Sequence, residues 1–301
     1  MISFCRQSIT VVLFALIVFT APSIEAASGK IIVGVVPEVN LVKQMDRFVP
    51  LSDYLDKKTG YDVEIKPLSN YGHLYEDMRD GNVDAGFFGS FVYCMTRARI
   101  GVVPIARPVL PGGRSTYSGI LFIRNDVGIK KSSDLKGKTI ALADPATSGG
   151  YLAQKDYLAG KGINIDKDMK IVWVGSHEAA IRAVMSHQAE VGGAKDSIVK
   201  KYRKENKVFD TLIEIINETP SGKGFPDNTF AVRKGLEQVK IDALKKALLH
   251  MDTDPEGKKV LQRFGAVRFI PTSDDDFKPL YDLVRHLRID LASYPYKKNG
   301  Q

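Results

Sequence analysis

Cysteine is nearly absent from this chain of 301 residues, which contains only Cys5 and Cys94. Cys5 precedes an apolar N-terminal run and is expected to leave with it, so no intramolecular disulfide is expected in the mature chain. Cys94 lies in an apolar stretch with no base at a recognisable spacing, which favours a small buried side chain over a catalytic thiol. Internal repeats and low-complexity segments are also absent from the sequence.

Apolar runs long enough to cross a bilayer are missing as well. The run from Ile9 to Ala21 carries no charge but is shorter than the roughly 20 residues that a spanning helix needs. Arg6 precedes this run, and the small residues Ala26-Ala27-Ser28 follow it. This order is typical of a secretory signal peptide. We therefore expect residues 1–26 to be a cleaved signal peptide and the mature protein to be periplasmic.

The sequence has no block of basic residues, although its formal charge is +8. Positive charges are dispersed along the chain, which together with export opposes nucleic-acid binding. Neither a metal-ligand cluster nor a nucleophile–base spacing is evident, so we expect no metal, no cofactor and no enzymatic activity. With 44% hydrophobic and 26% charged residues, the composition is that of an ordinary globular protein.

Buried strands alternate with amphipathic helices along most of the mature chain, which indicates an α/β fold with doubly wound sheets. The length suits two lobes of about 100–150 residues each. We expect residues 29–116 plus 226–301 to form lobe 1, residues 117–225 to form lobe 2, and two crossings to join them as a hinge. The tail from Leu236 onward is predicted to be mostly helical. Predicted strands lie at 30–37, 61–67, 83–88, 119–125, 138–143, 170–174 and 190–194.

Two hydroxyls and two glycines mark one junction between a predicted strand and the next helix, within residues 143–151. N–H groups in the first turn of a helix have no intrahelical partner, and the helix dipole adds positive potential there. Thr147 and Ser148 can donate hydrogen bonds, while Gly149 and Gly150 let an oxyanion approach the backbone. These residues predict an anion site, although Ser and Thr also serve as ordinary helix caps. No Gly-Lys-Ser/Thr follows, so this is not a Walker loop.

Other strand-to-helix junctions place polar and aromatic residues where ligands bind in open α/β sheets. His177 opens a helix after a predicted strand and can donate to an oxyanion, or it can be a cap or surface residue. Tyr71 and Ser90 stand at comparable junctions in the first half of the chain. Aromatic side chains there can wall a cleft and exclude water, and ordinary core packing is the alternative.

Five segments, taken in order, resemble those of a known family. The first contains Gly-x-Val-Asp and the last contains Gly-Ser-His-x-x-Ala. Together they resemble the phosphate-, phosphite- and phosphonate-binding proteins of ABC importers, the PhnD-like group, over nearly the whole mature chain. The segments are Gly81–Ser90, Tyr117–Ile129, Asp134–Thr139, Asp144–Gly150 and Gly175–Ala180.

The resemblance implies a type II periplasmic binding protein whose two lobes close on a phosphonate, phosphite or phosphate and deliver it to a membrane permease. The family's oxyanion contacts carry over to the hydroxyl run Thr147-Ser148-Gly149 and to His177. Acidic groups that hold the amine of aminophosphonates map near Asp196 and Asp227. The neighbouring cleft residues that the resemblance implies are Tyr71, Ser90 and Tyr117.

The sequence departs from the family pattern in two places. The usual Ser-Thr-Ser-Gly reads Thr147-Ser148-Gly149-Gly150, with one hydroxyl fewer. Lys195 precedes Asp196, where it can neutralise that carboxylate or bind an anionic tail; a plain surface charge is the preferred interpretation.

Two other functions remain open at this level. The same cleft can report its ligand to a membrane sensor kinase instead of a permease. An enzyme with His177 and Glu178 as an acid–base pair is disfavoured, because adjacent residues of a helix point about 100° apart.

Overall fold

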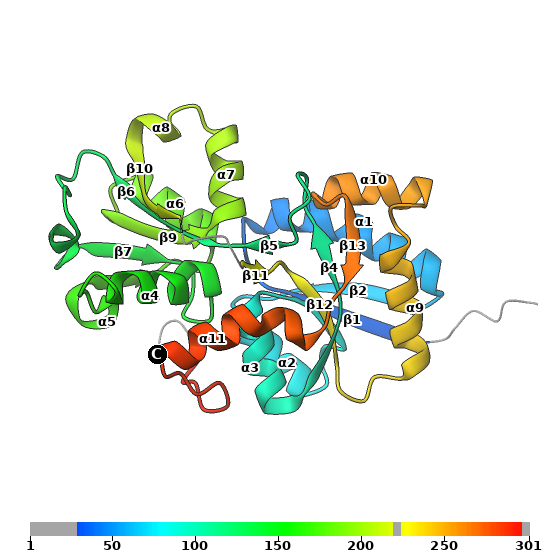
Figure 1. The fold of residues 1–301 in the computed structure, drawn as a ribbon. Coiled ribbons are helices and arrows are strands. Elements are labelled where there is room, and N and C mark those ends of the chain that lie inside the picture. The colour runs from blue at the N-terminus through cyan, green and yellow to red at the C-terminus, as the bar shows by residue number, and fades with distance from the viewer. Residues whose placement is uncertain (1–28, 219–223, 297–301) are drawn as a thin grey trace, which may run out of the picture.

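The computed structural model describes residues 29–218 and 224–296, so the predicted signal peptide lies outside the described residues. These residues form two α/β lobes that lie side by side, each built around its own sheet (Figure 1). The expected fold class is confirmed. Each sheet is mixed, with three parallel strands at one side and antiparallel strands completing the other.

The lobe 1 sheet has the strand order β13-β4-β12-β3-β1-β2. Strand β1, the middle one of the three parallel strands, consists mostly of β-branched residues, most of them buried, as expected for a parallel strand covered on both faces. The strands are β1 (Lys30–Val35), β2 (Asp62–Pro67), β3 (Ala85–Phe88), β4 (Val102–Val109), β12 (Thr229–Arg233) and β13 (Arg268–Pro271).

The helices of lobe 1 follow its strands and cover the sheet. The first of them is capped by the Asn40 side chain, which accepts from the Val42 amide, and ends at Gly60 with a φ of 75° that favours glycine. The helices are α1 (Leu41–Thr59), α2 (His73–Arg79), α3 (Ser90–Ile100), α9 (Gln238–Leu249), α10 (Pro255–Phe264), the 3-10 turn η4 (Asp274–Phe277) and α11 (Lys278–His286).

The lobe 2 sheet has the strand order β10-β6-β9-β7-β8, so its parallel strands β8-β7-β9 repeat the order of β2-β1-β3. Its strands are β6 (Gly119–Arg124), β7 (Thr139–Leu142), β8 (Lys170–Trp173), β9 (Val191–Lys195) and β10 (Ile213–Glu218). Its helical elements are η1 (Ser132–Leu135), η2 (Ser148–Leu152), α4 (Ala153–Ala159), α5 (Ile165–Asp168), α6 (His177–Met185), α7 (Asp196–Glu205) and α8 (Phe209–Leu212).

A two-stranded antiparallel pair connects the lobes. It consists of β5 (Thr116–Tyr117) and β11 (Phe225–Pro226), with Phe225 opposite Tyr117. The chain enters lobe 2 through β5 and returns to lobe 1 through β11, as Figure 1 shows.

Three strands of four or more residues and one helix of more than four residues were missed by the sequence patterns. The tail is mostly helical, as predicted, but it also contains β13, which pairs with β4 and completes the lobe 1 sheet. β4 itself contains Pro104 and Pro108, residues that argue against a central strand. The structure accommodates Pro104 opposite a register shift between Phe230 and Ala231. The other two missed elements are α7 and β10.

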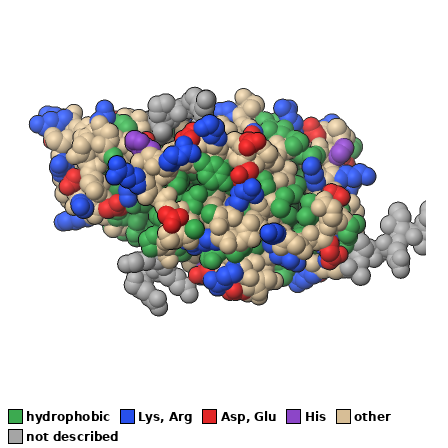
Figure 2. Space-filling view, turned by 60° about the horizontal axis from the view of Figure 1, so that its bottom comes forward, with side chains coloured by type: hydrophobic (Ala, Val, Ile, Leu, Met, Phe, Trp, Pro, Cys, Tyr) green, Lys and Arg blue, Asp and Glu red, His purple; other side chains and the backbone are tan. Residues whose placement is uncertain are grey.

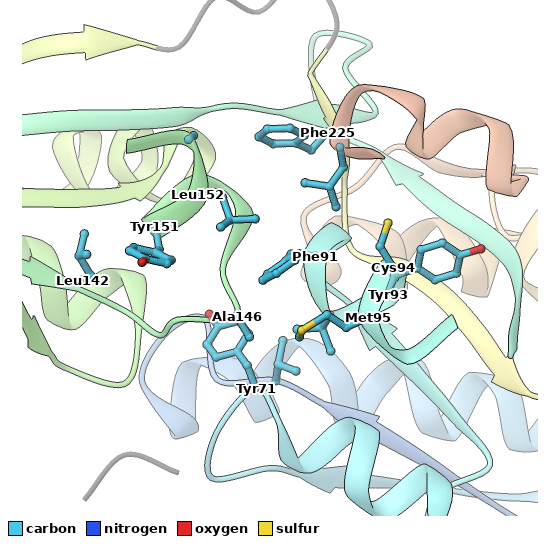
Figure 3. Packing of buried hydrophobic residues seen from close by; sticks show 14 of the residues in the cluster. Tyr71, Phe91, Tyr93, Cys94, Met95, Leu142, Ala146, Tyr151, Leu152 and Phe225 are labelled. Carbon is cyan, nitrogen blue, oxygen red and sulfur yellow. The ribbon is translucent and has the colours of Figure 1, made fainter. Parts of the chain in front are cut away.

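The apolar core continues from one lobe into the other. One buried cluster contains Leu74, Phe91 and Val92 of lobe 1 together with Leu142 and Leu152 of lobe 2. Figure 3 shows the Phe91 side chain reaching from α3 toward the lobe 2 segment. Two further clusters cover the outer faces of the two sheets. Cys94 is fully buried in the shared cluster, as predicted.

The surface carries charges of both signs. On the face in Figure 2, lysine and arginine side chains are interspersed with aspartate and glutamate, and no continuous basic stripe forms there. Among the described residues, no helix has the length and hydropathy that a membrane crossing requires.

Candidate functional site

The candidate site lies where the carboxyl ends of the parallel strands of both lobes face each other. In sheets of this order, ligands bind where the direction of chain progression reverses, beside the first strand. Buried polar residues follow β1, β2 and β3 in lobe 1, follow β7 and β8 or end β9 in lobe 2, and lie in or directly after the crossing strands β5 and β11. We refer to them as the interlobe cluster: Glu38, Tyr71, Ser90, Tyr117, Thr147, Ser148, His177, Lys195, Asp227 and Asn228.

The hydroxyl run occupies the start of the helix after β7. η2 is a π-helical turn, an irregularity often found at functional sites, and it continues directly into α4. Ser148 is 2% exposed, and its Oγ accepts from the backbone N–H of Phe91 in lobe 1 over 3.0 Å. Thr147 donates its hydroxyl to the Asp144 carbonyl over 2.7 Å, which fixes the turn before the helix.

Glycines allow the start of this helix to pack closely against the sheet. A Cβ on Gly119 would lie 2.5 Å from the Gly149 carbonyl oxygen, and one on Gly193 would lie 2.6 Å from that of Gly150. Gly150 also faces the site, because a Cβ there would lie 2.6 Å from Thr147 Oγ1 and 3.0 Å from His177 Cε1. The glycines therefore set how closely the hydroxyls and His177 approach one another.

His177 is the first residue of α6 and is held inside the cluster. Its helix is capped by Ser176, whose Oγ accepts from the Ala179 amide. Burial lowers the pKa of His177 to about 4; the Glu38 carboxylate opposes this shift and the Lys195 ammonium adds to it. The ring is therefore neutral at pH 7. Its Nδ1 accepts from the Lys195 backbone N–H over 3.4 Å, which leaves Nε2 as the protonated, donating nitrogen.

Two tyrosines wall the cluster from lobe 1 and from the crossing strand. The Tyr71 ring meets the His177 ring edge-on, with centroids 6.3 Å apart. The Tyr71 hydroxyl is buried and has no hydrogen-bond partner among the described residues. Burial raises the pKa of Tyr117, opposed by the Lys195 ammonium and by hydrogen bonds with the Ser148 and Ser90 hydroxyls. Both tyrosines are therefore neutral donors at pH 7.

Ser90 and Asp227 link the site to the crossing segment. Ser90 begins α3 and donates its hydroxyl to the Pro226 carbonyl over 2.7 Å. Asp227 directly follows β11, and one of its oxygens accepts from its neighbour's backbone N–H, that of Asn228, over 2.8 Å. Its other oxygen, Oδ2, is buried without a partner in the described structure.

Lys195 was expected to be a surface charge, and that expectation is wrong. The residue is 3% exposed and lies at the end of β9, inside the cluster. Its Nζ lies 2.6 Å from Asp227 Oδ1 and 3.0 Å from Glu38 Oε1. It also sits 4.6 Å from the centroid of the Tyr117 ring. A lysine of lobe 2 thus pairs with carboxylates of lobe 1 and of the crossing segment.

Asp196 belongs to a different network from the one predicted. It is fully buried, and its carboxylate accepts from Ser118 N over 3.1 Å, from Arg114 over 2.7 Å and from Lys200 over 3.2 Å. These three partners fix the start of α7 and the crossing strand. The structure therefore gives Asp196 a local structural role and places Lys195, its neighbour, in the cluster.

His177 and Glu178 do not form a pair. Glu178 turns toward lobe 1, where it accepts from Lys43 Nζ over 3.1 Å and from the Asn40 amide over 3.3 Å. The side chains of His177 and Glu178 thus point apart, as expected from helix geometry. They are not placed to act as an acid–base pair. Within residues 29–218 and 224–296, no group of three His, Cys, Asp or Glu residues is arranged to hold a metal ion.

Two cluster residues were not predicted at all. Glu38 follows β1 at the same edge where Thr147 follows β7, so the strand-end rule that found the hydroxyl run also applies to it. Asn228 donates to Glu38 over 2.6 Å, a pairing across 190 residues that carries no local sequence signal.

A groove of about 400 Å³ opens beside the cluster. Glu38, Lys195 and Asp227 contribute to its lining, and Arg47 and Arg263 lie along it. The groove joins the buried acid–lysine part of the cluster to the surface.

Comparison with known proteins places this geometry in a family. Residues 33–277 match the family model described as "ABC transporter, phosphonate, periplasmic substrate-binding protein". The phosphonates-binding periplasmic protein of Escherichia coli (strain K12) is 24% identical over 241 residues, which cover 79% of this chain and 70% of the relative. The phosphate-import protein PhnD of Mycolicibacterium smegmatis is 28% identical over 176 residues. That second match spans 55% of each chain, only about half the length of this relative.

A solved structure supports the fold. PhnD1 from Prochlorococcus marinus (MIT 9301), in complex with methylphosphonate, superposes with a TM-score of 0.77 at 22% identity, covering 86% of this chain and 98% of the other. Members of the matched family are binding components of transporters, not enzymes. The chain therefore belongs to the family of periplasmic substrate-binding proteins of phosphonate ABC transporters.

Proposed function

We propose that this protein captures a small phosphorus oxyanion, of the phosphonate, phosphite or phosphate type, between its lobes and delivers it to the permease of an ABC importer. The observation that carries this proposal is the buried Tyr71 hydroxyl, which lacks a partner and lies beside His177. A buried hydroxyl without a partner costs about 1–3 kcal/mol, so its retention favours a role toward a ligand.

The donors suit a tetrahedral anion. Ser148 brings a hydroxyl, the first turn of η2 brings backbone N–H groups, and His177 brings Nε2–H. The Thr147 hydroxyl donates to the Asp144 carbonyl and holds the turn that presents these groups. Tyr71 lies beside His177, and Tyr117 lies beside Ser148 and Ser90. Neutral donors in a buried site form charge-assisted bonds with an oxyanion and replace its water shell.

Closure of the lobes accompanies binding in this proposal. Contacts between lobes already ring the cluster, including the Phe91–Ser148 bond and the Lys43–Glu178 ion pair. A ligand that contacts both lobes favours the closed state by its differential affinity for that state.

The relatives support both the ligand class and the importer role. One relative is named for phosphate import and another for phosphonate binding, and the superposed structure holds methylphosphonate. The sensor-kinase alternative finds no support among these matches, so transport is the function we propose.

Calorimetric titration of the ligand-stripped protein tests the proposal. Phosphite, phosphate and methylphosphonate are compared with methanesulfonate, which has the same shape as methylphosphonate but a single negative charge. We expect saturable binding of at least one phosphorus anion, and weaker binding of methanesulfonate. The double variant Ser148→Ala/His177→Ala should lose that binding. Absence of binding by every phosphorus anion, or equal affinity in the double variant, would reject the proposed function.

A further inference from the structure

Glu38 and Asp227 form the acidic side of the cluster, and Lys195 of the same chain is the cation that pairs with them. Glu38 and Asp227 are 7% and 2% exposed, and two buried carboxylates this close require a positive partner. Lys195 Nζ supplies it, with Asn228 Oδ1 at 3.3 Å as a third acceptor beside the two carboxylates. An ammonium has three protons, so these three acceptors use all of its donors.

The charges around this lysine are balanced without a ligand. Burial alone would raise the pKa of Glu38, but Lys195, and after it Arg47, bring it to about 2. Burial would lower the pKa of Lys195, yet Asp227 and Glu38 raise it above its usual value. Two carboxylates thus face two cations, and neither an added cation nor an added anion is needed there.

The lysine also adjoins the oxyanion part of the cluster. Tyr117 adjoins both parts, because its ring lies under Lys195 Nζ while the Ser148 and Ser90 hydroxyls are close enough to its own hydroxyl to oppose the rise in its pKa. The Lys195 backbone N–H contacts His177 as well. When Ser148 and His177 hold the oxygens of a phosphonate, the substituent on its phosphorus therefore lies next to the Lys195 ammonium.

We propose that Lys195 is a specificity-determining residue that occupies the place of a ligand cation, so that the site takes phosphorus anions with a small neutral substituent and rejects those with an ammonium group. This inference rests on the proposed function and names the substrate class of the same site. A ligand ammonium would lie against the Lys195 ammonium, and although Asp227 Oδ2 can still accept a hydrogen bond, the charge of that carboxylate is already neutralised by Lys195. A neutral hydroxyl or methyl group at the same position meets no such repulsion, and Asp227 Oδ2 keeps an acceptor open to a hydroxyl.

Three ligands of nearly equal size test this inference by calorimetry: propylphosphonate, 2-hydroxyethylphosphonate and 2-aminoethylphosphonate. The wild-type protein should bind the amine at least about tenfold more weakly than either neutral ligand, a factor equivalent to about 1.4 kcal/mol. Equal binding of the three ligands, or preference for the amine, would overturn the inference while leaving the proposed function intact. Failure of all three, and of methylphosphonate, would instead reject the proposed function and this inference with it.

Variants separate specificity from a merely structural role. Lys195→Met leaves Glu38 and Asp227 without their cation, so the ligand ammonium can take its place and the ratio of amine to propyl affinity should rise at least about tenfold. Lys195→Arg keeps the charge and should keep the wild-type ratio. Lys170→Met, at an exposed position at the start of β8, is the matched control. A uniform loss of affinity for all three ligands in Lys195→Met, with the ratio unchanged, would show that the lysine only supports the fold.

The wild-type comparison does not depend on the folding of any variant. Circular dichroism and thermal melting of Lys195→Met establish whether its titrations report on a folded protein. If that variant unfolds, addition of ethylammonium should restore its melting temperature more than it changes that of Lys170→Met, because the free amine fills the same place. No selective restoration would count against the inference.

Discussion

The backbone N–H of Phe91 donates to Ser148 Oγ over 3.0 Å, and this bond joins the first turn of α3 in lobe 1 to the first turn of η2 in lobe 2. Both helix starts follow buried parallel strands, so the positive ends of the two helix dipoles meet at one point. In the proposed function, the Ser148 hydroxyl therefore serves both lobe closure and ligand binding.

Replacement of Ser148 by alanine should weaken methylphosphonate binding about tenfold to a hundredfold. The expectation follows from the loss of a hydrogen bond to a charged group, which contributes about 1.5–3 kcal/mol. Calorimetry measures the change. Ser186→Ala is the control, because Ser186 donates only to Ala183 O at the end of α6. Equal affinities in wild type and Ser148→Ala would remove Ser148 from the site.

Tyr71→Phe should separate ligand binding from stability. The Tyr71 hydroxyl has no partner in the described structure, so its removal should leave the melting temperature of the ligand-free protein unchanged or raised. The rise in melting temperature on adding ligand should shrink. Tyr93→Phe is the matched control, since the Tyr93 hydroxyl pairs with Asp274 over 3.0 Å. The control should lower the ligand-free melting temperature and keep the ligand-induced rise; the same behaviour in Tyr71→Phe would contradict the assignment.

The neutral state of His177 predicts a pH dependence of stability. Its pKa is lowered from 6.5 to about 4 by burial, so between these values the unfolded chain binds more protons than the folded one. Stability should therefore rise with pH from about 4 to 6.5 and be lost as the pH falls through this window, by on the order of 1–3 kcal/mol. Urea unfolding of His177→Gln should show a flatter profile than that of the control His286→Gln, an exposed position. Identical profiles would mean that His177 is not buried in its neutral form.

A tyrosine near the C-terminus connects the two lobes on the side of the hydroxyl run. The Tyr296 hydroxyl lies 2.8 Å from Asp144 Oδ2 in lobe 2 and 3.1 Å from Asn70 Oδ1 in lobe 1. Burial raises the pKa of Asp144 to about 6, so this carboxylate is ionised at pH 8 and largely protonated at pH 5.

Tyr296→Phe should therefore destabilise the protein more at pH 8 than at pH 5, by about 1–2 kcal/mol at the higher pH. The bond from Tyr296 stabilises the ionised form, and a hydrogen bond to a charged group is stronger than a neutral one. Chemical unfolding at the two pH values gives the comparison. Tyr157→Phe, a half-buried position in α4, should change little at either pH. A loss of stability that is larger at pH 5 than at pH 8 would contradict the assignment of Asp144 as ionised at pH 8 and protonated at pH 5.

The positions of several candidate site residues could be predicted because their signals are local. Thr147, Ser148 and His177 follow strands whose apolar runs are evident in the sequence, and strand ends of parallel sheets converge. Lys195 was misjudged for the opposite reason. Its partners Glu38 and Asp227 lie 157 and 32 residues away, and only the approach of the two lobes brings them together.

The fold shows the same division between local and distant causes. The strand–helix alternation through β1–β3 and β6–β9 follows from local periodicity. β13 is four residues long and half exposed, so nothing in its own sequence distinguishes it from a loop. It forms a strand because its backbone pairs with β4, with Arg268 opposite Val109 and Pro271 opposite Ala106.

A crystal structure of the protein with methylphosphonate tests the central claim most directly. We predict the phosphorus between the lobes, with its oxygens within hydrogen-bond distance of the Tyr71 hydroxyl, Ser148 Oγ and His177 Nε2, and with Lys195 still paired to Asp227. Density for the anion in the basic groove beside Arg47 and Arg263, with the Tyr71 hydroxyl still unpartnered, would contradict the account.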